Sequence, residues 1–468
     1  MDNLDIIAKI LDYNSTILYN FLCVDKKLSN KLLNYISILC LFNNTNCKNK
    51  HLKLLQNIHT LILPHNKNIT DDGLKYISKI HTLNLDSNNK ITDEGLQYIS
   101  NIHTLNLNNN YNITDNGLKY IPNIYKLELS NGHKITDLGL KYIPNIRYLD
   151  LTETEIITNE GIKYIPNIHT LLFENNNNIT EECFKYIPNI TKLCLYLDDI
   201  SITNNGLKLI PKIQSLEIIK SDITNNGLSY IPNIHILELG TSKITNNGLK
   251  YISNIHTLSL CDNVTITDKG LKYLKNINKL SLYNNTMITD NGLKYLKNIH
   301  TLSLHSNNNI TDHGLKYIKN IHTLILDNNT NITDQGLKYL KNIHILELEN
   351  NNKITDLGLK YLKNIHTLIL NKNKNITDIG LQYLINIHIL NIYCNENITN
   401  EGLKYMHNIH TINLYKNKNN SNINKYHYIL DNLVIYTDLI NQDINLAKII
   451  KDNKKYIPNI KKFCYIVN

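Results

Sequence analysis

Three kinds of residue recur in the sequence at spacings that could serve chemistry. Twelve histidines precede similar apolar stretches, and a row of imidazoles could bind a metal ion or titrate near neutral pH. Tyr follows Lys in the same local context along most of the chain, as in Lys75-Tyr76 and Lys119-Tyr120, and aromatic rings beside basic residues can stack on single-stranded nucleic acid. Eight cysteines could act as nucleophiles, metal ligands or disulfide partners.

These residues recur because the chain is built from a repeated unit of 22 residues. The unit reads I-T-D-x-G-L-K-Y-I-x-N-I-H-T-L-x-L-x-x-N and occurs sixteen times, with an extra leading strand near Leu61. Its glycine is missing only at Cys183, and one step of 23 residues and two of 21 fall between Cys183 and Gly248. A period this regular predicts one solenoid rather than several unrelated domains.

Each unit carries the signals of one strand and one short helix. Leu105 and Leu107 alternate with polar residues, which is the period of a half-buried strand. Thr114-Asp115 then supplies a cap and an acidic first turn, and Leu118 begins an apolar helical face. Pro122 ends the helix and directs the chain toward the next strand. A single unit cannot bury these apolar residues, so we expect stacked units to share a core.

The strand motif I-x-x-L-x-L-x-x-N resembles the leucine-rich repeat, and I-T-D-x-G-L-x-x-I resembles the cysteine-containing subtype typical of F-box proteins. The resemblance covers residues 52–417 and implies an α/β solenoid in the form of a horseshoe, with a parallel sheet on its concave side and short helices on its convex side. It also implies a buried asparagine ladder that bonds the backbone of adjacent turns. The asparagines in that position are Asn88, Asn110, Asn176, Asn263, Asn285, Asn307, Asn329, Asn351, Asn373, Asn395 and Asn417. Residues 418–468 are expected to cap the solenoid, with a decayed repeat around Tyr456.

Residues 1–45 lie outside the repeat, and apolar stripes predict helices over most of them. Their pattern resembles an F-box, which implies docking on a Skp-type adaptor protein. The other interpretation of the same stripes is an amphipathic cap on the first repeat. The residues that we expect to dock are Ile6, Ile7, Ile10, Leu11, Leu18, Leu22 and Val24.

The repeated columns favour structural roles over chemistry. A uniform row of histidines offers no point on which ligands converge, so we expect no metal. The tyrosines are expected to pack on neighbouring turns, and lysine on exposed helices is ordinary. The cysteines form no CxxC pair, and no phosphate loop, nucleophile elbow or HExxH motif occurs. We therefore expect neither an enzyme nor a cofactor.

Specificity is expected on the concave face around each L-x-L motif. Nine acidic residues and three lysines occupy these positions, an excess of six negative charges, which disfavours nucleic acid. The pattern is least regular over residues 124–242, which could mark a contact surface or drift in the repeat. The residues that we expect to contact a basic or mixed partner are Glu128, Tyr148, Asp150, Glu174, Tyr196, Glu217 and Glu238.

The resemblance implies a substrate-recognition adaptor of a cullin-type ubiquitin ligase, with a Skp-type protein and an unidentified substrate as partners. A stand-alone interaction scaffold is the alternative. No apolar run reaches the roughly 18 residues that span a bilayer and no basic leader is present, so we expect a cytoplasmic monomer outside its complex, with no membrane partner. Lys supplies nearly all basic residues, Ala occurs twice and Trp is absent, a composition of AT-rich codons found in large DNA viruses and protists.

Overall fold

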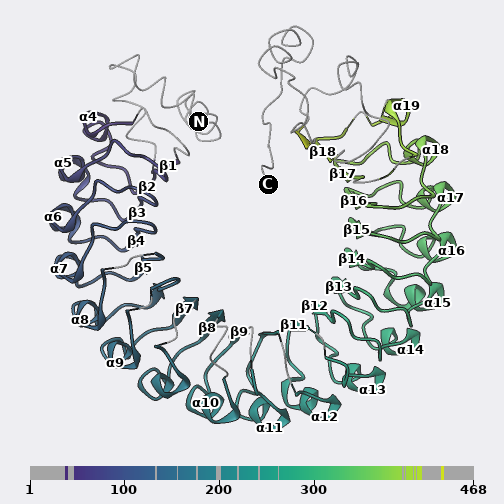
Figure 1. The fold of residues 1–468 in the computed structure, drawn as a ribbon, viewed down its shortest axis with the longest axis horizontal. Helices are drawn as coiled ribbons and strands as arrows, with labels where there is room; N and C mark the ends of the chain where they lie inside the picture. The colour runs from purple at the N-terminus through teal and green to yellow at the C-terminus, as the bar shows by residue number, and fades with distance from the viewer. Residues whose placement is uncertain are drawn as a thin grey trace, which may run out of the picture. The chain divides into compact units, whose positions relative to one another are not determined.

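The computed structural model describes residues 37–40, 47–131, 134–154, 156–174, 178–196, 202–218, 221–240, 243–261, 263–392, 395, 397–403, 405–406, 408–413 and 434–436. The chain divides into an N-terminal unit, Met1–Ile234, and a C-terminal unit, His235–Asn468. Within each unit, every repeat contributes one strand to a parallel sheet and one short helix to the opposite side (Figure 1). We call the exposed side of the strands the inner face and the helical side the outer face.

The strands of the N-terminal unit are β1 (Ile38–Cys40), β2 (Thr60–Ile62), β3 (Thr82–Asn84), β4 (Thr104–Asn106), β5 (Lys126–Glu128), β6 (Tyr148–Asp150), β7 (Thr170–Glu174), β8 (Lys192–Tyr196) and β9 (Ser215–Ile218). Its helices are α4 (Asn49–Leu52), α5 (Asp71–Leu74), η1 (Lys75–Ile77), α6 (Asp93–Leu96), η2 (Gln97–Ile99), α7 (Asp115–Leu118), α8 (Asp137–Leu140), α9 (Asn159–Ile162), η3 (Glu181–Tyr186), α10 (Asn204–Leu209) and α11 (Asn225–Leu228), where η marks a 3-10 helix.

The strands of the C-terminal unit are β10 (Ile236–Leu239), β11 (Thr257–Leu260), β12 (Lys279–Ser281), β13 (Thr301–Ser303), β14 (Thr323–Ile325), β15 (Ile345–Glu347), β16 (Thr367–Ile369), β17 (Ile389–Asn391), β18 (Thr411–Asn413) and β19 (Val434–Tyr436). Its helices are α12 (Asn246–Leu249), η4 (Lys250–Ile252), α13 (Asp268–Leu271), α14 (Asp290–Leu293), α15 (Asp312–Leu315), η5 (Lys316–Ile318), α16 (Asp334–Leu337), α17 (Asp356–Leu359), α18 (Asp378–Leu381) and α19 (Asn400–Leu403).

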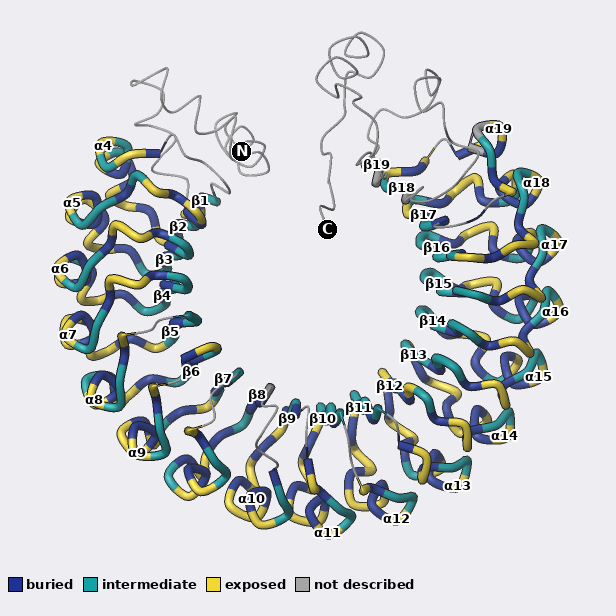
Figure 2. Tube along the Cα trace, viewed as in Figure 1, coloured by how far each residue is buried: buried dark blue, intermediate teal, exposed yellow. Residues whose placement is uncertain are grey.

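The core lies between the strands and the helices, as the dark blue segments of Figure 2 show. In the regular repeats the central leucine of each strand is fully buried and pairs with the leucine of the next strand, as Leu105 does with Leu127. The helix adds a second layer of fully buried residues such as Leu118 and Ile121. The predicted α/β solenoid, its strand period and its shared core are therefore confirmed.

A ladder of buried asparagines joins successive repeats. Asn307 donates from Nδ2 to the backbone oxygens of Asn285, at 2.6 Å, and Ile288, at 3.2 Å, and its Oδ1 accepts from the amide of Asn309 at 3.0 Å. The same arrangement begins one repeat before the predicted set, at Asn66. The ladder implied by the resemblance is confirmed wherever its asparagines are described; Asn176 and Asn417 lie outside the described residues.

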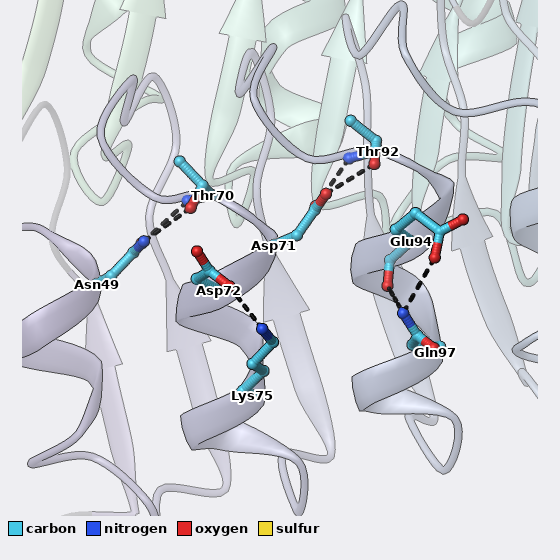
Figure 3. A network of polar contacts seen from close by, with 8 residues as sticks. All are labelled: Asn49, Thr70, Asp71, Asp72, Lys75, Thr92, Glu94 and Gln97. Carbon is cyan, nitrogen blue, oxygen red and sulfur yellow. Dashed lines mark hydrogen bonds and ion pairs between the residues drawn. The ribbon is translucent and has the colours of Figure 1, made fainter.

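A second polar ladder runs along the outer side, between helices of adjacent repeats. The carboxylate of Asp71 accepts from the Thr92 amide at 2.9 Å and from the Thr92 hydroxyl at 2.7 Å, and Asn49 makes the corresponding pair with Thr70 (Figure 3). Thr114 also caps its own helix as predicted, because its hydroxyl accepts from the Asn116 amide at 3.2 Å. The helix start at Thr114 is thus bonded both to itself and, through Asp93, to the preceding repeat.

The glycine column exists because these helix starts approach one another closely. A Cβ atom at Gly292 would lie 2.4 Å from Oδ1 of Asp268 in the preceding repeat. The one repeat that lacks this glycine has Cys183, and its outer segment is the 3-10 helix η3 instead of an α-helix. The exception in sequence is therefore also an exception in local structure.

Both ends of the solenoid extend beyond the predicted boundaries. Ile38–Cys40 form β1 and pair with β2, so the predicted helix is wrong for these residues, which supply the first described strand of the sheet. At the other end, β19 pairs with β18 inside the segment expected to form a cap. Tyr456 and its predicted decayed repeat lie outside the described residues.

We predict that Asn307→Ala lowers the free energy of unfolding by about 2–4 kcal/mol, because it leaves two buried carbonyl groups and one amide without their partner. Chemical denaturation followed by circular dichroism measures the change. Asn320→Ala, at an exposed position of the same region, is the matched control and should change stability by less than about 0.5 kcal/mol. Equal effects of the two substitutions would contradict the role of the ladder.

Candidate partner-binding face

The inner face of the N-terminal unit brings together six of the seven predicted contact residues on β5–β9. Parallel register places Glu128 beside Asp150 and Lys126 beside Tyr148. It likewise pairs Glu174 on β7 with Tyr196 on β8. The Tyr196 side chain lies outside the described residues, so only its backbone position is established. Strand alternation therefore directs the predicted acidic side chains to one side of one sheet.

Tyr148 sits in a charged cluster at the start of this surface. The Lys126 ammonium lies 4.1 Å from the centre of the Tyr148 ring and 2.8 Å from Oε1 of Glu128. Asn106 donates a hydrogen bond to the other oxygen of the same carboxylate. Burial raises the pKa of Tyr148 to about 12, with a further contribution from the Glu128 and Asp150 carboxylates. The phenol is therefore a neutral donor at physiological pH.

Two of the carboxylates beside this cluster are not neutralised. Asp150 accepts from the Thr152 amide at 3.0 Å, but among the described residues neither Asp150 nor Glu174 has an ion-pair partner. Both are half-buried, and the apolar side chain of Leu172 lies between them on β7. Asp150 and Glu174 can therefore receive positive charge from a partner.

The remaining acidic residues of the predicted set are already paired. Glu217 on β9 lies 3.6 Å from the Lys192 ammonium in the N-terminal unit. Glu238, in the C-terminal unit, lies 4.0 Å from that of Lys279. Together with Lys126, these lysines account for the three basic residues noted on the inner face. The inner-face lysines thus neutralise three particular glutamates, Glu128, Glu217 and Glu238.

The C-terminal unit carries an acidic cluster on the inner side of β14 and β15. Burial raises the pKa of both Asp327 and Glu347, and the neighbouring carboxylates raise that of Glu347 further. His305 lies with Nδ1 3.7 Å from Oδ2 of Asp327, and its ring stacks on Tyr283 at 4.5 Å. The carboxylates are recognisable in the sequence as acidic residues around L-x-L motifs, but His305 is not, because a single histidine in a variable position gives no signal by itself.

The histidine column forms stacks of imidazoles at the edge of the inner face. In the C-terminal unit the rings of His300, His322, His344, His366, His388 and His410 follow one another with centroids 4.4 to 5.0 Å apart. Nδ1 of His322 lies 3.1 Å from the hydroxyl of Thr323, and His366 has the same relation to Thr367 at 3.0 Å. Parallel rings cannot converge on one ion, and no group of three metal-ligating side chains occurs among the described residues.

The tyrosine column lies on the outer face beneath lysine side chains. The Lys75 ammonium lies 5.0 Å from the ring centre of Tyr98 in the next repeat, and Lys119 has the same relation to Tyr142. The rings are half-exposed, since Tyr76 keeps 38% of its surface accessible. An ammonium group thus lies over the ring in several repeats, which supports the packing interpretation over base stacking.

The other candidate chemistry receives no support from the described residues. Cys183 is fully buried, and burial raises the pKa of its thiol to about 12, which makes it a poor nucleophile. No helix in the described parts of the chain has the length and apolar character to cross a membrane. All seven F-box-like residues, from Ile6 to Val24, lie outside the described residues.

Comparison with known proteins supports the fold. The sequence matches the family described as Leucine Rich repeat over residues 54–78, 78–100, 98–121, 142–165 and 339–363. The crystal structure of a TLR13–ssRNA13 complex is similar with a TM-score of 0.52 and 18% identity, over 77% of this chain and 68% of that chain. The fold is that of a leucine-rich-repeat solenoid.

Two further solved structures align less closely. An internalin (inlF) from Listeria monocytogenes has a TM-score of 0.48 and 25% identity, over 63% of this chain and 88% of its own. The Rad7–Elc1 complex of yeast has a TM-score of 0.42 and 17% identity, over 76% of this chain and 92% of that chain. No curated protein matches the sequence.

The imidazole stack predicts a loss of stability in mild acid. Burial, and then the adjacent imidazoles, lower the pKa of His322 and His366 in the folded chain. The folded state therefore binds fewer protons than the unfolded state, so stability falls as pH drops below the ordinary histidine pKa of about 6.5. The loss ends once pH is below the lowered folded values.

Melting temperatures at about pH 7.5 and about pH 5 test this expectation. The variant H322N/H344N/H366N, which copies the natural Asn278 in the same column, should lose less stability between the two values than the wild type does. Asp327 and Glu347 titrate with the opposite sign, because their pKa values are raised, but they are present in both proteins. Equal losses in the two proteins would refute the effect.

Proposed function

We propose that this chain is a non-catalytic recognition protein that acts as the substrate-recognition adaptor of a cullin-type ubiquitin ligase. The F-box-like segment, residues 1–45, docks on a Skp-type protein, and the inner face holds the substrate. The observation that carries the recognition role is the surface on β6 and β7, where the carboxylates of Asp150 and Glu174 have no ion-pair partners among the described residues.

This surface has the chemistry of a protein-binding site. Tyr148 supplies a large ring with a neutral donor, and Leu172 supplies apolar area on the adjacent strand. Aromatic anchors beside apolar area characterise the energetically important parts of protein interfaces. The unneutralised carboxylates favour a partner that presents lysine or arginine. We therefore infer a basic or mixed protein surface as the substrate's contact region.

The ligase link rests on the sequence resemblance in residues 5–28 and on its position in the chain. The first described strand is β1, and residues 5–28 precede it in the sequence. A terminal repeat also needs a cover for its core, which supports the alternative, a stand-alone interaction scaffold in which the same segment is a cap. The two functions differ in whether a Skp-type protein binds.

Co-purification of the full chain with a Skp-type protein tests the ligase link. We expect retention by the wild type and loss of retention in I6D/I10D, because aspartate removes the apolar stripe expected to dock. The variant N3D/N14D, changed at polar positions of the same segment, is the control and should bind like the wild type. If the wild type does not retain the Skp-type protein, the ligase link is wrong and the stand-alone scaffold is the remaining function.

For a protein substrate that binds the full chain, D150K/E174K should weaken binding by about 10- to 100-fold, because it reverses the charge of the surface. The control E160K/E182K reverses two charges on the outer face of the same repeats, where both glutamates pair with lysines. Isothermal titration calorimetry measures both affinities. Loss of affinity in the control alone would place the substrate elsewhere.

A further inference from the structure

The outer faces of the two units differ in charge. We compare the helical segments of six repeats in each unit. Each segment starts at the residue after the capping threonine and is nine residues long, as in 268–276. Segments 268–276, 290–298, 312–320, 334–342, 356–364 and 378–386 contain eleven lysines and six aspartates, a net charge of +5. Segments 71–79, 93–101, 115–123, 137–145, 159–167 and 181–189 contain six lysines and nine acidic residues, a net charge of −3. The positive total of the chain therefore gathers on the C-terminal unit.

The structure keeps this difference at the surface, because the first acidic residue of a segment is half-buried and bonded to the next repeat in both units, as Asp93 is to Thr114. Each aspartate of the C-terminal segments is half-buried and occupied by the next repeat; Asp334, for example, accepts from the amide and hydroxyl of Thr355 at 2.8 and 2.6 Å. The lysines are exposed, except that Lys338 is half-buried. In the N-terminal unit, exposed acids such as Asp72 pair with lysines of the same helix. The C-terminal unit thus presents lysine with little exposed carboxylate to balance it.

Protruding aliphatic side chains stand among these lysines. Leu357 on α17 and Ile379 on α18 keep 60% and 59% of their surface exposed. They occupy equivalent positions in consecutive repeats, where every other repeat except that of Leu138 carries a polar residue, such as Asn291 or Gln335. Ile385 is 51% exposed and takes the position that Lys363 has one repeat earlier. Neither an outer-face helix nor a solvated surface requires aliphatic residues at these positions.

We propose that the outer face of residues 334–386 binds peripherally to an anionic lipid bilayer. The lysines Lys338, Lys341, Lys360 and Lys363 would face the negative headgroups, to which each contributes favourable electrostatic energy. Leu357, Ile379 and Ile385 would enter the boundary between headgroups and acyl chains, as the apolar residues of interfacial helices do. The inner face lies on the other side of each repeat and stays open to a substrate.

A lipid surface fits these observations better than nucleic acid does. Single-stranded nucleic acid needs exposed aromatic faces for stacking, but the ammonium groups of Lys338 and Lys360 lie 5.0 and 5.1 Å from the ring centres of Tyr339 and Tyr361. Exposed leucine and isoleucine add nothing to phosphate recognition. The expectation of no membrane partner rests on the absence of a spanning run and of a basic leader, and peripheral binding to a lipid surface requires neither.

Sedimentation of the full chain with vesicles tests the proposal. We expect binding to vesicles with about 30% phosphatidylserine, weakening with added salt, and little binding to phosphatidylcholine alone. K338Q/K341Q/K360Q/K363Q should reduce the partition coefficient by about 100-fold or more. The control K75Q/K119Q/K141Q/K163Q removes four lysines from the N-terminal unit and should leave it nearly unchanged. Equal effects of the two variants would overturn the placement of the site.

The absence of tryptophan from the chain permits a direct measure of insertion. We expect the emission of L357W to shift to shorter wavelength on anionic vesicles. L138W is the matched control, because Leu138 occupies the same helical position in the N-terminal unit and is 62% exposed; its emission should not shift. Circular dichroism confirms that each variant is folded. No shift in L357W, the same shift in both variants, or tighter binding to a single-stranded oligonucleotide than to vesicles would overturn the proposal.

Discussion

The solenoid depends on the pairing of buried backbone groups at each turn between strand and helix. Parallel strands of three residues satisfy few of these groups, and an unpaired buried carbonyl or amide costs more than its hydrogen bond would contribute. One asparagine per repeat solves this, since its amide nitrogen reaches back to the preceding repeat and its oxygen accepts from its own. Thr154 takes the asparagine position in one repeat, and its hydroxyl donates to the carbonyl oxygen of Leu151 in its own turn.

The repeat made much of the fold predictable. Alternating leucines located the strands, and Thr114 was correctly placed as a helix cap. Local rules could not reveal the bonds between Asp93 and Thr114, because they join residues 21 apart whose proximity exists only after stacking. The acidic residue was interpreted through the helix dipole of its own turn, whereas it also bonds the next turn. The same limitation hid β1, since three strand residues without a complete repeat resemble the end of an apolar helix.

The candidate site divides in the same way. Period-2 alternation is enough to put Glu128, Tyr148 and Asp150 on one face, and the structure shows them there. Counting charges, however, cannot identify which carboxylates are neutralised, because that depends on distances in the folded chain. Lys126 pairs with Glu128 on its own strand, whereas Lys192 pairs with Glu217 on the next strand. Only their pairing singles out Asp150 and Glu174. The F-box-like residues fall outside the described part of the chain, and their role remains a proposal based on resemblance.

The unequal repeats have a consequence for how the chain finds its fold. Nearly identical units offer nearly identical surfaces, so a partly folded chain could stack a repeat on the wrong neighbour and leave one looped out. The steps of 23 and 21 residues break this translational symmetry. Phe173 and Phe184, the largest fully buried side chains among the described residues, take core positions that leucine holds in the regular repeats. The irregular repeats therefore mark one position along the solenoid, and they give the native stacking of repeats a different energy from out-of-register stackings.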